Sequence, residues 1–206
     1  MILKDSEPKD LITEPHWRPS QKTILNQRNG EIYIISRSEE VIVTNHQLET
    51  LTSLCNEPAV YKIFFKDKLN GEPFSIQNAA ELLETAAQGW KDQSQFFFTI
   101  LDRTGLISGI IRIKSANRDL AEIGYWCSEK HRGIMSNAVR VVSELAEEAG
   151  FSALCAKVRK DNWASIKVLN NNNFLCSGDW PGDPSRFRFE VQLSPLNLAN
   201  CHFLST

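Results

Sequence analysis

The sequence predicts an α+β sandwich with a central mixed sheet, because strand-like and helix-like segments alternate in a definite order. Two strand-like runs, residues 95–101 and 106–114, are separated by the glycine-terminated turn Asp102-Arg-Thr-Gly105, which predicts an antiparallel hairpin. A third strand-like run, residues 121–127, follows within a few residues and extends the hairpin to a meander. Helix, strand, helix and strand patterns then follow, and they complete the sandwich.

The N-terminal part is predicted to hold an extension, a strand and a helix. Residues 1–24 are rich in Pro, Lys, Glu and Asp, and we expect an extension that wraps the domain or stays loose, with Trp17 as its large apolar anchor. Residues 30–37 have the composition of a strand. Thr44-Asn-His-Gln47 has the capping-box pattern that begins a helix, and Asn56-Glu-Pro58 ends it.

The other elements follow from apolar spacing and from their end signals. The helix that follows the meander carries its apolar residues on one stripe, and Gly150 stands where a helix C-cap glycine belongs. The predicted elements are a helix over residues 75–90 capped by Ser75, a helix over 136–149, a strand over 152–158, a helix opened by 159–165 and ending at Phe174, a last strand over 187–193, and a tail from 195 to 206.

Composition and charge exclude several function classes. At 206 residues, with 42% apolar and 23% charged residues, the chain fits one globular domain. A net charge of −2 gives no reason to expect a nucleic-acid or anionic-membrane partner. We expect no signal peptide and no membrane span, since residues 1–7 lack a basic leader and no segment approaches ~20 apolar residues.

The five cysteines are an odd, scattered set without C-x-x-C spacing, and none of the four histidines has the spacing of metal ligands. A disulfide framework or a metal site is therefore not expected, and a reducing compartment is the default. Together these features predict a soluble cytoplasmic protein.

The segment that joins the third strand to the next helix predicts a phosphorylated ligand. The strand leads through Ser128-Glu-Lys-His-Arg-Gly133 directly into the helix. A glycine-containing turn at a helix N-terminus presents several free backbone N–H groups, and these together with the helix dipole bind anions.

Three motifs in this region resemble the GNAT acetyltransferase superfamily, and within it the ribosomal-protein N-terminal acetyltransferases (RimL- and RimJ-like). They are Ala121-Glu-Ile-Gly-Tyr-Trp126, Gly133-Ile-Met-Ser136 and Asp161-Asn-Trp-Ala-Ser165. The resemblance implies a domain over residues 25–194 with a GNAT-like α/β/α sandwich, whose mostly antiparallel sheet is splayed between two central strands. It also implies acetyl-CoA as co-substrate and an amine as acceptor, with no metal.

The diphosphate loop departs from the family pattern (Gln/Arg)-x-x-Gly-x-(Gly/Ala). Without gaps it reads Lys130-His-Arg-Gly-Ile-Met135, and the connection to it from Trp126 is about two residues shorter than usual. The resemblance still implies that the loop binds the diphosphate, through Lys130, His131, Arg132, Gly133, Ile134, Met135 and Ser136. The alternative is an ordinary strand-to-helix turn with a solvated basic cluster.

The resemblance assigns further roles beside the loop. Tyr125, Trp126 and Cys127 correspond to strand positions whose backbone pairs with the pantetheine arm, although Trp126 and Cys127 can also be core side chains. Asn162 corresponds to an asparagine near the same arm, and either it or Asp161 can equally be the N-cap of the next helix.

Two residues are candidates for catalysis. Ser165 corresponds to a serine that can protonate the leaving thiolate, or it is a first-turn serine that bonds its own backbone. Glu122 corresponds to a water-relayed base, or it simply faces solvent. Asp179 and Asp183 lie where relatives keep an acidic residue that contacts the acceptor, but turn-forming composition explains both without function.

The expected function is transfer of the acetyl group of acetyl-CoA to a primary amine, on a protein N-terminus or a small molecule, by direct attack without a covalent enzyme intermediate. The altered loop leaves open a weak or inactive GNAT-fold interaction module. A different acyl-CoA, or an acceptor such as a polyamine or an amine antibiotic, is a further alternative, and the chain is expected to be a monomer or a homodimer.

Overall fold

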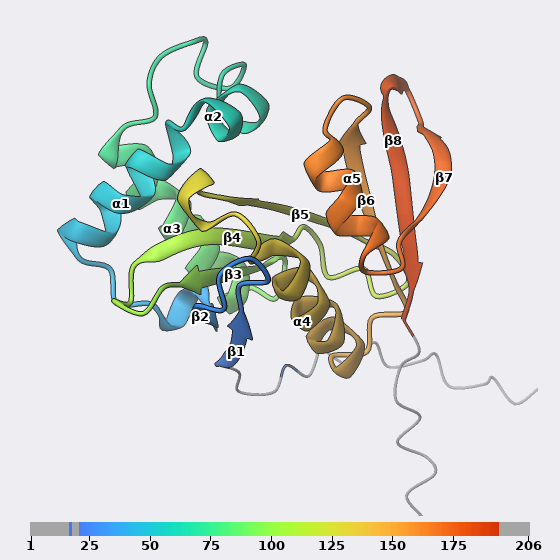
Figure 1. The fold of residues 1–206 in the computed structure, drawn as a ribbon, viewed down its shortest axis with the longest axis horizontal. Helices are drawn as coiled ribbons and strands as arrows, with labels where there is room; N and C mark the ends of the chain where they lie inside the picture. The colour runs from blue at the N-terminus through green and yellow to red at the C-terminus, as the bar shows by residue number, and fades with distance from the viewer. Residues whose placement is uncertain (1–16, 18–20, 194–206) are drawn as a thin grey trace, which may run out of the picture.

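A computed structural model describes Trp17 and residues 21–193 (Figure 1). Its eight strands form one sheet in the order β1-β2-β3-β4-β5-β6-β8-β7, which is antiparallel except between β5 and β6. The strands are β1 (Lys22–Leu25), β2 (Ile32–Arg37), β3 (Phe96–Leu101), β4 (Ile107–Ile113), β5 (Ala121–Cys127), β6 (Ala153–Arg159), β7 (Leu175–Trp180) and β8 (Asp183–Gln192). The α-helices are α1 (Asn45–Cys55), α2 (Pro58–Phe64), α3 (Ile76–Lys91), α4 (Met135–Glu148) and α5 (Trp163–Asn170).

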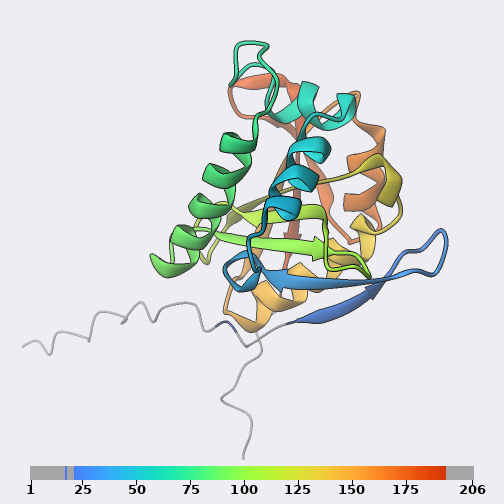
Figure 2. The ribbon, with the colours of Figure 1, turned by 90° about the vertical axis from the view of Figure 1, so that its left-hand side faces the viewer.

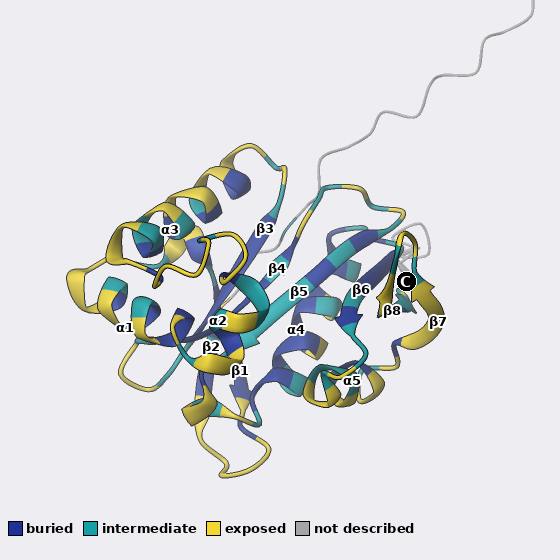
Figure 3. Cartoon of the chain, turned by 90° about the horizontal axis from the view of Figure 1, so that it is seen from above, coloured by how far each residue is buried: buried dark blue, intermediate teal, exposed yellow. Residues whose placement is uncertain are grey.

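Helices cover both faces of the sheet, as Figures 2 and 3 show, and a buried core lies on each face. Because successive side chains of a strand point to opposite faces, neighbours in β3 enter different cores. Phe97 packs with apolar residues of α1, α2 and α3, whereas Phe96 and Phe98 pack with those of α4. The predicted sandwich with a mixed sheet is confirmed.

The two central strands diverge, and this divergence places the site. β5 and β6 are parallel and pair only at Ala121 with Leu154 and at Glu122 with Cys155. Beyond Glu122, β5 still pairs with β4 as far as Cys127, but it no longer pairs with β6. Backbone groups on that edge of β5 are therefore available to a ligand, and the expected splay is confirmed.

Three elements were not predicted: β1, α2 and β7. The signal for α2 was present, because Pro58 occupies its first turn, where a missing N–H costs nothing. β7 falls partly in a segment that the sequence analysis took for a turn, and its residues are almost all exposed, so no alternation of buried and exposed side chains marked it.

Three predicted details were wrong. The helix expected to end at Phe174 ends at Asn170, since asparagines follow and Asn173 adopts a left-handed φ of 60°. The last strand begins at Asp183 instead of residue 187. Thr44 does cap α1, but Gln47 does not complete the capping box; its side chain bonds instead to Gly105 O and Ile107 N of the β3–β4 hairpin.

Trp17 packs its ring against Trp90 and Phe96, with ring centroids 5.3 and 4.7 Å apart, as expected of an apolar anchor. The rest of the predicted extension up to residue 20, and the tail from 195 to 206, lie outside the described residues. The division at residues 24 and 194 stays a prediction. Within the described residues, no helix is both long and apolar enough to span a membrane, and the cytoplasmic location also stays a prediction.

Candidate active site

The turn before α4 contains a glycine, Gly133, that packs so closely against the β1–β2 hairpin that any other residue would force a shift. Gly133 has φ = +110°, a conformation that L side chains rarely adopt. A Cβ atom at this position would lie 2.3 Å from Asn26 Oδ1. The β1–β2 hairpin causes this crowding, because Asn26 Nδ2 donates to Arg132 O and Gln27 N donates to Gly133 O.

Helix α4 begins without a side-chain cap. Its N-cap residue, Ile134, has helical backbone angles and gives no side-chain hydrogen bond to the first turn. The N–H groups of Met135 and Ser136, at the positive end of the helix dipole, are thus available to an anion. The predicted anion-binding helix start therefore has the required backbone geometry.

A cavity of about 550 Å³ runs from this helix start to the splay between β5 and β6. We call it the larger cavity; α2 and α5 form its other walls. Of the predicted site residues, those that line it are Tyr125, Trp126, Cys127, Arg132, Gly133, Met135, Ser136, Asn162 and Ser165.

Three predicted members of the diphosphate loop do not line the larger cavity. Ile134 is fully buried in the core, and the Lys130 side chain is exposed. His131 Nδ1 lies 2.8 Å from the Tyr33 hydroxyl, so its ring braces the loop against β2. The basic cluster of the sequence is thus divided, and of its three residues only Arg132 lines the larger cavity.

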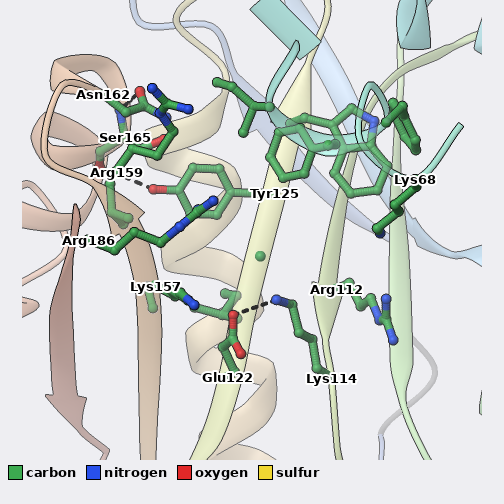
Figure 4. A pocket seen from close by; sticks show the side chains of 18 of the residues that line it. Lys68, Arg112, Lys114, Glu122, Tyr125, Lys157, Arg159, Asn162, Ser165 and Arg186 are labelled. Carbon is green, nitrogen blue, oxygen red and sulfur yellow. Dashed lines mark hydrogen bonds and ion pairs between the residues drawn. The ribbon is translucent and has the colours of Figure 1, made fainter. Parts of the chain in front are cut away.

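A second cavity, of about 230 Å³, adjoins the first and extends along β5 toward Glu122; we call it the smaller cavity (Figure 4). Tyr125, Trp126, Asn162 and Ser165 line both cavities. Glu122 lines the smaller one and contacts Lys114 Nζ. The two predicted catalytic residues therefore border the same cavity, with Ser165 at the junction.

The junction is organised by the start of α5. Asn162 is the N-cap, and its Oδ1 accepts a hydrogen bond from Ser165 N at 3.1 Å. The Tyr125 hydroxyl donates to Ser165 O at 3.2 Å, and burial raises the pKa of Tyr125, so the phenol stays protonated. Two hydroxyl groups, those of Ser165 and Tyr125, thus lie where the cavities meet.

Residues 42–174 match the Acetyltransferase (GNAT) domain family. The chain belongs to the GNAT acetyltransferase family. Among curated protein sequences, none matches this chain significantly.

Solved GNAT structures share this fold. The spermidine N-acetyltransferase of Vibrio cholerae, solved with CoA and spermine, superposes with a TM-score of 0.60 at 14% identity, covering 79% of this chain and 96% of that one. RimJ of Mycobacterium smegmatis, solved with CoA-disulfide, gives 0.62 at 14% identity, with 81% and 85% covered. The ribosomal-protein-S5-alanine acetyltransferase of Vibrio fischeri gives 0.56 at 17%, with 79% and 93% covered.

Sequence reasoning missed several residues that line the larger cavity. Gln27 and Arg28 reach the larger cavity from the β1–β2 hairpin, and Lys167 and Asn171 reach it from α5 and its end. The hairpin was not predicted and lies about a hundred residues before the diphosphate loop, so no local pattern connected the two. The Asn29-Gly30 pair was the available signal for a turn.

The cysteine in the larger cavity is poorly suited to nucleophilic attack. Burial, followed by repulsion from Glu57, raises the pKa of Cys127 to about 11. The thiolate is the nucleophilic form of cysteine, so little of it exists near neutral pH.

Trp126 packs with Phe64 and Phe65 in the core beneath α2, at centroid distances of 5.1 and 5.9 Å, so its core and cavity-wall roles coexist.

The two aspartates considered as acceptor contacts form ion pairs. Asp179 binds Lys160 at 2.6 Å, and Asp183 binds Lys157 at 2.9 Å. Hydrogen bonds, first from Ser185 and then from Lys157, lower the pKa of Asp183 to about 2, so it stays ionised. Neither aspartate lines the larger or the smaller cavity. The described part of the chain contains no group of three or more His, Cys, Asp or Glu side chains that could hold a metal ion.

Proposed function

We propose that this GNAT protein transfers the acetyl group of acetyl-CoA to a primary amine by direct attack of the amine on the thioester. The observation that carries the proposal is the junction of two cavities at Tyr125 and Ser165. One cavity leads from the junction to the start of α4, and the other extends from it along β5 to Glu122. Two substrates can then meet across the splay between the central strands.

Acetyl-CoA fits the larger cavity by its chemistry. Its diphosphate would lie against the first turn of α4, where no side chain caps the helix, beside the left-handed turn at Gly133. Arg28, Arg132 and Lys167 supply positive charge on the same walls. Two fold neighbours were solved with CoA compounds, which supports this placement.

Acetyl-CoA supplies an activated acyl group, and the protein supplies alignment and proton handling. Holding two reactants in register lowers a barrier by roughly 7–11 kcal/mol. The unpaired edge of β5 beyond Glu122 would bind the pantetheine arm through backbone hydrogen bonds. The raised pKa of Cys127 supports direct transfer, since this thiol is held protonated.

Ser165 and Glu122 would handle protons on opposite sides of the transfer. The Ser165 hydroxyl borders both cavities, so it can protonate the departing sulfur. Glu122 borders the cavity through which the amine would enter, and it can accept the amine proton through water. Positioning of the two substrates would contribute most of the catalysis.

A thermal-unfolding experiment with acetyl-CoA tests the proposal. A ligand at 100 times its dissociation constant stabilises the folded state by about 2.7 kcal/mol, which raises the melting temperature measurably. We expect such a rise, together with release of free CoA when an amine is added. Absence of any shift at millimolar acetyl-CoA would instead support the inactive interaction module.

A further inference from the structure

The smaller cavity has a strong and uneven charge. Cationic side chains from β4, β6, β8 and the turn after α2 line it, and among the described residues Glu122 is its one lining carboxylate. In Figure 4 these labelled cations lie on both sides of Tyr125. They are Lys68, Arg112 and Lys114 on one side, and Lys157, Arg159 and Arg186 on the other.

Carboxylates within the protein neutralise some of these cations. Lys114 contacts Glu122, and Arg159 pairs with Asp161 at 2.9 Å. Lys157 and Arg186 share Asp183, at 2.9 and 3.1 Å. At longer range Asp67 attracts Arg159 while Lys62 attracts Asp161, so these outer charges largely offset one another. The cations still outnumber the carboxylates that they contact.

Lys68 and Arg112 remain without an ion-pair partner in the described part of the chain. The Arg112 guanidinium lies 4.9 Å from the Phe97 ring centroid, and its buried Nε has no hydrogen-bond partner among the described residues. Burial lowers the pKa of Arg112, although attraction to Glu122 opposes this. Partial burial, then repulsion by Arg112 and Lys114, lowers the pKa of Lys68.

Such an arrangement has a free-energy cost that an anion would relieve. Arg112 is half-buried and has no ion-pair partner in the described part of the chain, which costs free energy, and the exposed Lys68 beside it adds repulsion between like charges. A phosphate or carboxylate at Lys68 and Arg112 would restore the missing charge and the missing hydrogen bond, and such charge-assisted bonds are strong. A polycationic acceptor would be repelled from the same walls.

We propose that the acceptor is a small molecule carrying both a primary amine and a phosphate or carboxylate group, with the anionic group bound by Lys68 and Arg112. The amine would then point toward Ser165 at the junction with the larger cavity. A volume of about 230 Å³ suits a small molecule. The inference rests on the proposed acetyl transfer and specifies its acceptor.

The chemistry balances without any further reactant. The amine nitrogen forms a bond to the acetyl carbon as the carbon–sulfur bond breaks. The nitrogen loses one proton and the sulfur gains one, so the products are an N-acetylated anionic amine and CoA. The anionic group takes no part in bond formation, and its role is to orient the amine.

The first test compares amines that differ in charge. With acetyl-CoA saturating, we expect kcat/KM for O-phosphoethanolamine to exceed that for ethanolamine by about tenfold or more, with spermidine the poorest of the three. Arg112→Gln and Lys68→Gln should each lose most of this preference. We expect KM for O-phosphoethanolamine to rise in both variants, with kcat nearly unchanged. Lys91→Gln, at the end of α3, is the matched control and should keep it.

The second measurement does not depend on the choice of amine. In the presence of saturating CoA, which occupies the start of α4, inorganic phosphate should raise the melting temperature of the wild type and of Lys91→Gln. It should not do so in Lys68→Gln or Arg112→Gln. The Lys68 side chain is exposed, so Lys68→Gln should fold normally and keeps the test informative even if Arg112→Gln folds poorly.

The outcomes separate the two proposals. No stabilisation by CoA or acetyl-CoA would overturn the proposed function itself. Binding of acetyl-CoA without any phosphate effect in the wild type would overturn the anionic acceptor alone. Preferred acetylation of ethanolamine or spermidine would overturn it as well, and acetylation of acidic peptides only would overturn the small-molecule assignment.

Discussion

The two cavities that meet at Tyr125 are built in different ways. The larger one is shaped at one end by backbone: the left-handed turn at Gly133, the uncapped start of α4 and the unpaired edge of β5. The smaller one is shaped by long charged side chains that four separate segments contribute. Backbone geometry suits a co-substrate shared by a whole family, whereas side chains can change from one member to another and so set the acceptor.

The largest effect is expected from a change at the end of the larger cavity that backbone shapes. In Gly133→Asp, the new Cβ would meet Asn26 Oδ1 at 2.3 Å, and the carboxylate would repel the diphosphate. We expect acetyl-CoA affinity to fall by about 100-fold or more, as measured by calorimetry. Circular dichroism would verify that the variant folds.

Gly105→Asp is the matched control for that variant. Gly105 also has a left-handed φ, of +81°, but nothing lies within 4 Å of a Cβ built there. It carries the same backbone strain and the same added charge at the tip of the β3–β4 hairpin. Equal affinity in the wild type and Gly133→Asp would show that the diphosphate binds elsewhere.

The contrast between the cavities also explains what the sequence could predict. The strand, glycine turn and helix around Gly133 are contiguous, so their pattern alone was enough to predict an anion site. Lys68, Arg112 and Arg186 belong to segments far apart in the sequence, and only the fold brings them to one cavity. Arg28 was also missed, because it reaches the site through a hairpin whose first strand, β1, had no clear strand pattern.

A second prediction concerns how far water reaches the wall of the larger cavity at Cys127. Since the pKa of Cys127 is raised to about 11, its thiolate fraction rises about tenfold per pH unit up to that value. At pH 8 we expect iodoacetamide to label Cys127 about ten- to a hundredfold more slowly than the exposed Cys176, as measured by peptide mass spectrometry. The difference in labelling rate between the two cysteines should become smaller as the pH rises.

Saturating acetyl-CoA should slow the labelling of Cys127 further and leave that of Cys176 unchanged. The second thiol thus serves as an internal control for reagent and pH. Equal labelling of both at pH 8 would mean that water reaches Cys127 freely, and the raised pKa would then no longer argue against a covalent intermediate.

The smallest effect concerns the point where the cavities meet. Ser165→Ala should lower kcat at least about tenfold and leave acetyl-CoA affinity nearly unchanged, because the hydroxyl would act only as the sulfur departs. Tyr125→Phe is the comparison: its hydroxyl already donates to Ser165 O, whereas the Ser165 hydroxyl makes no hydrogen bond within the described residues. Single-turnover rates of both variants would show which of the two hydroxyl groups donates the proton. An unchanged rate in Ser165→Ala beside a large loss in Tyr125→Phe would assign the proton to the phenol, whose raised pKa keeps it protonated throughout the neutral range.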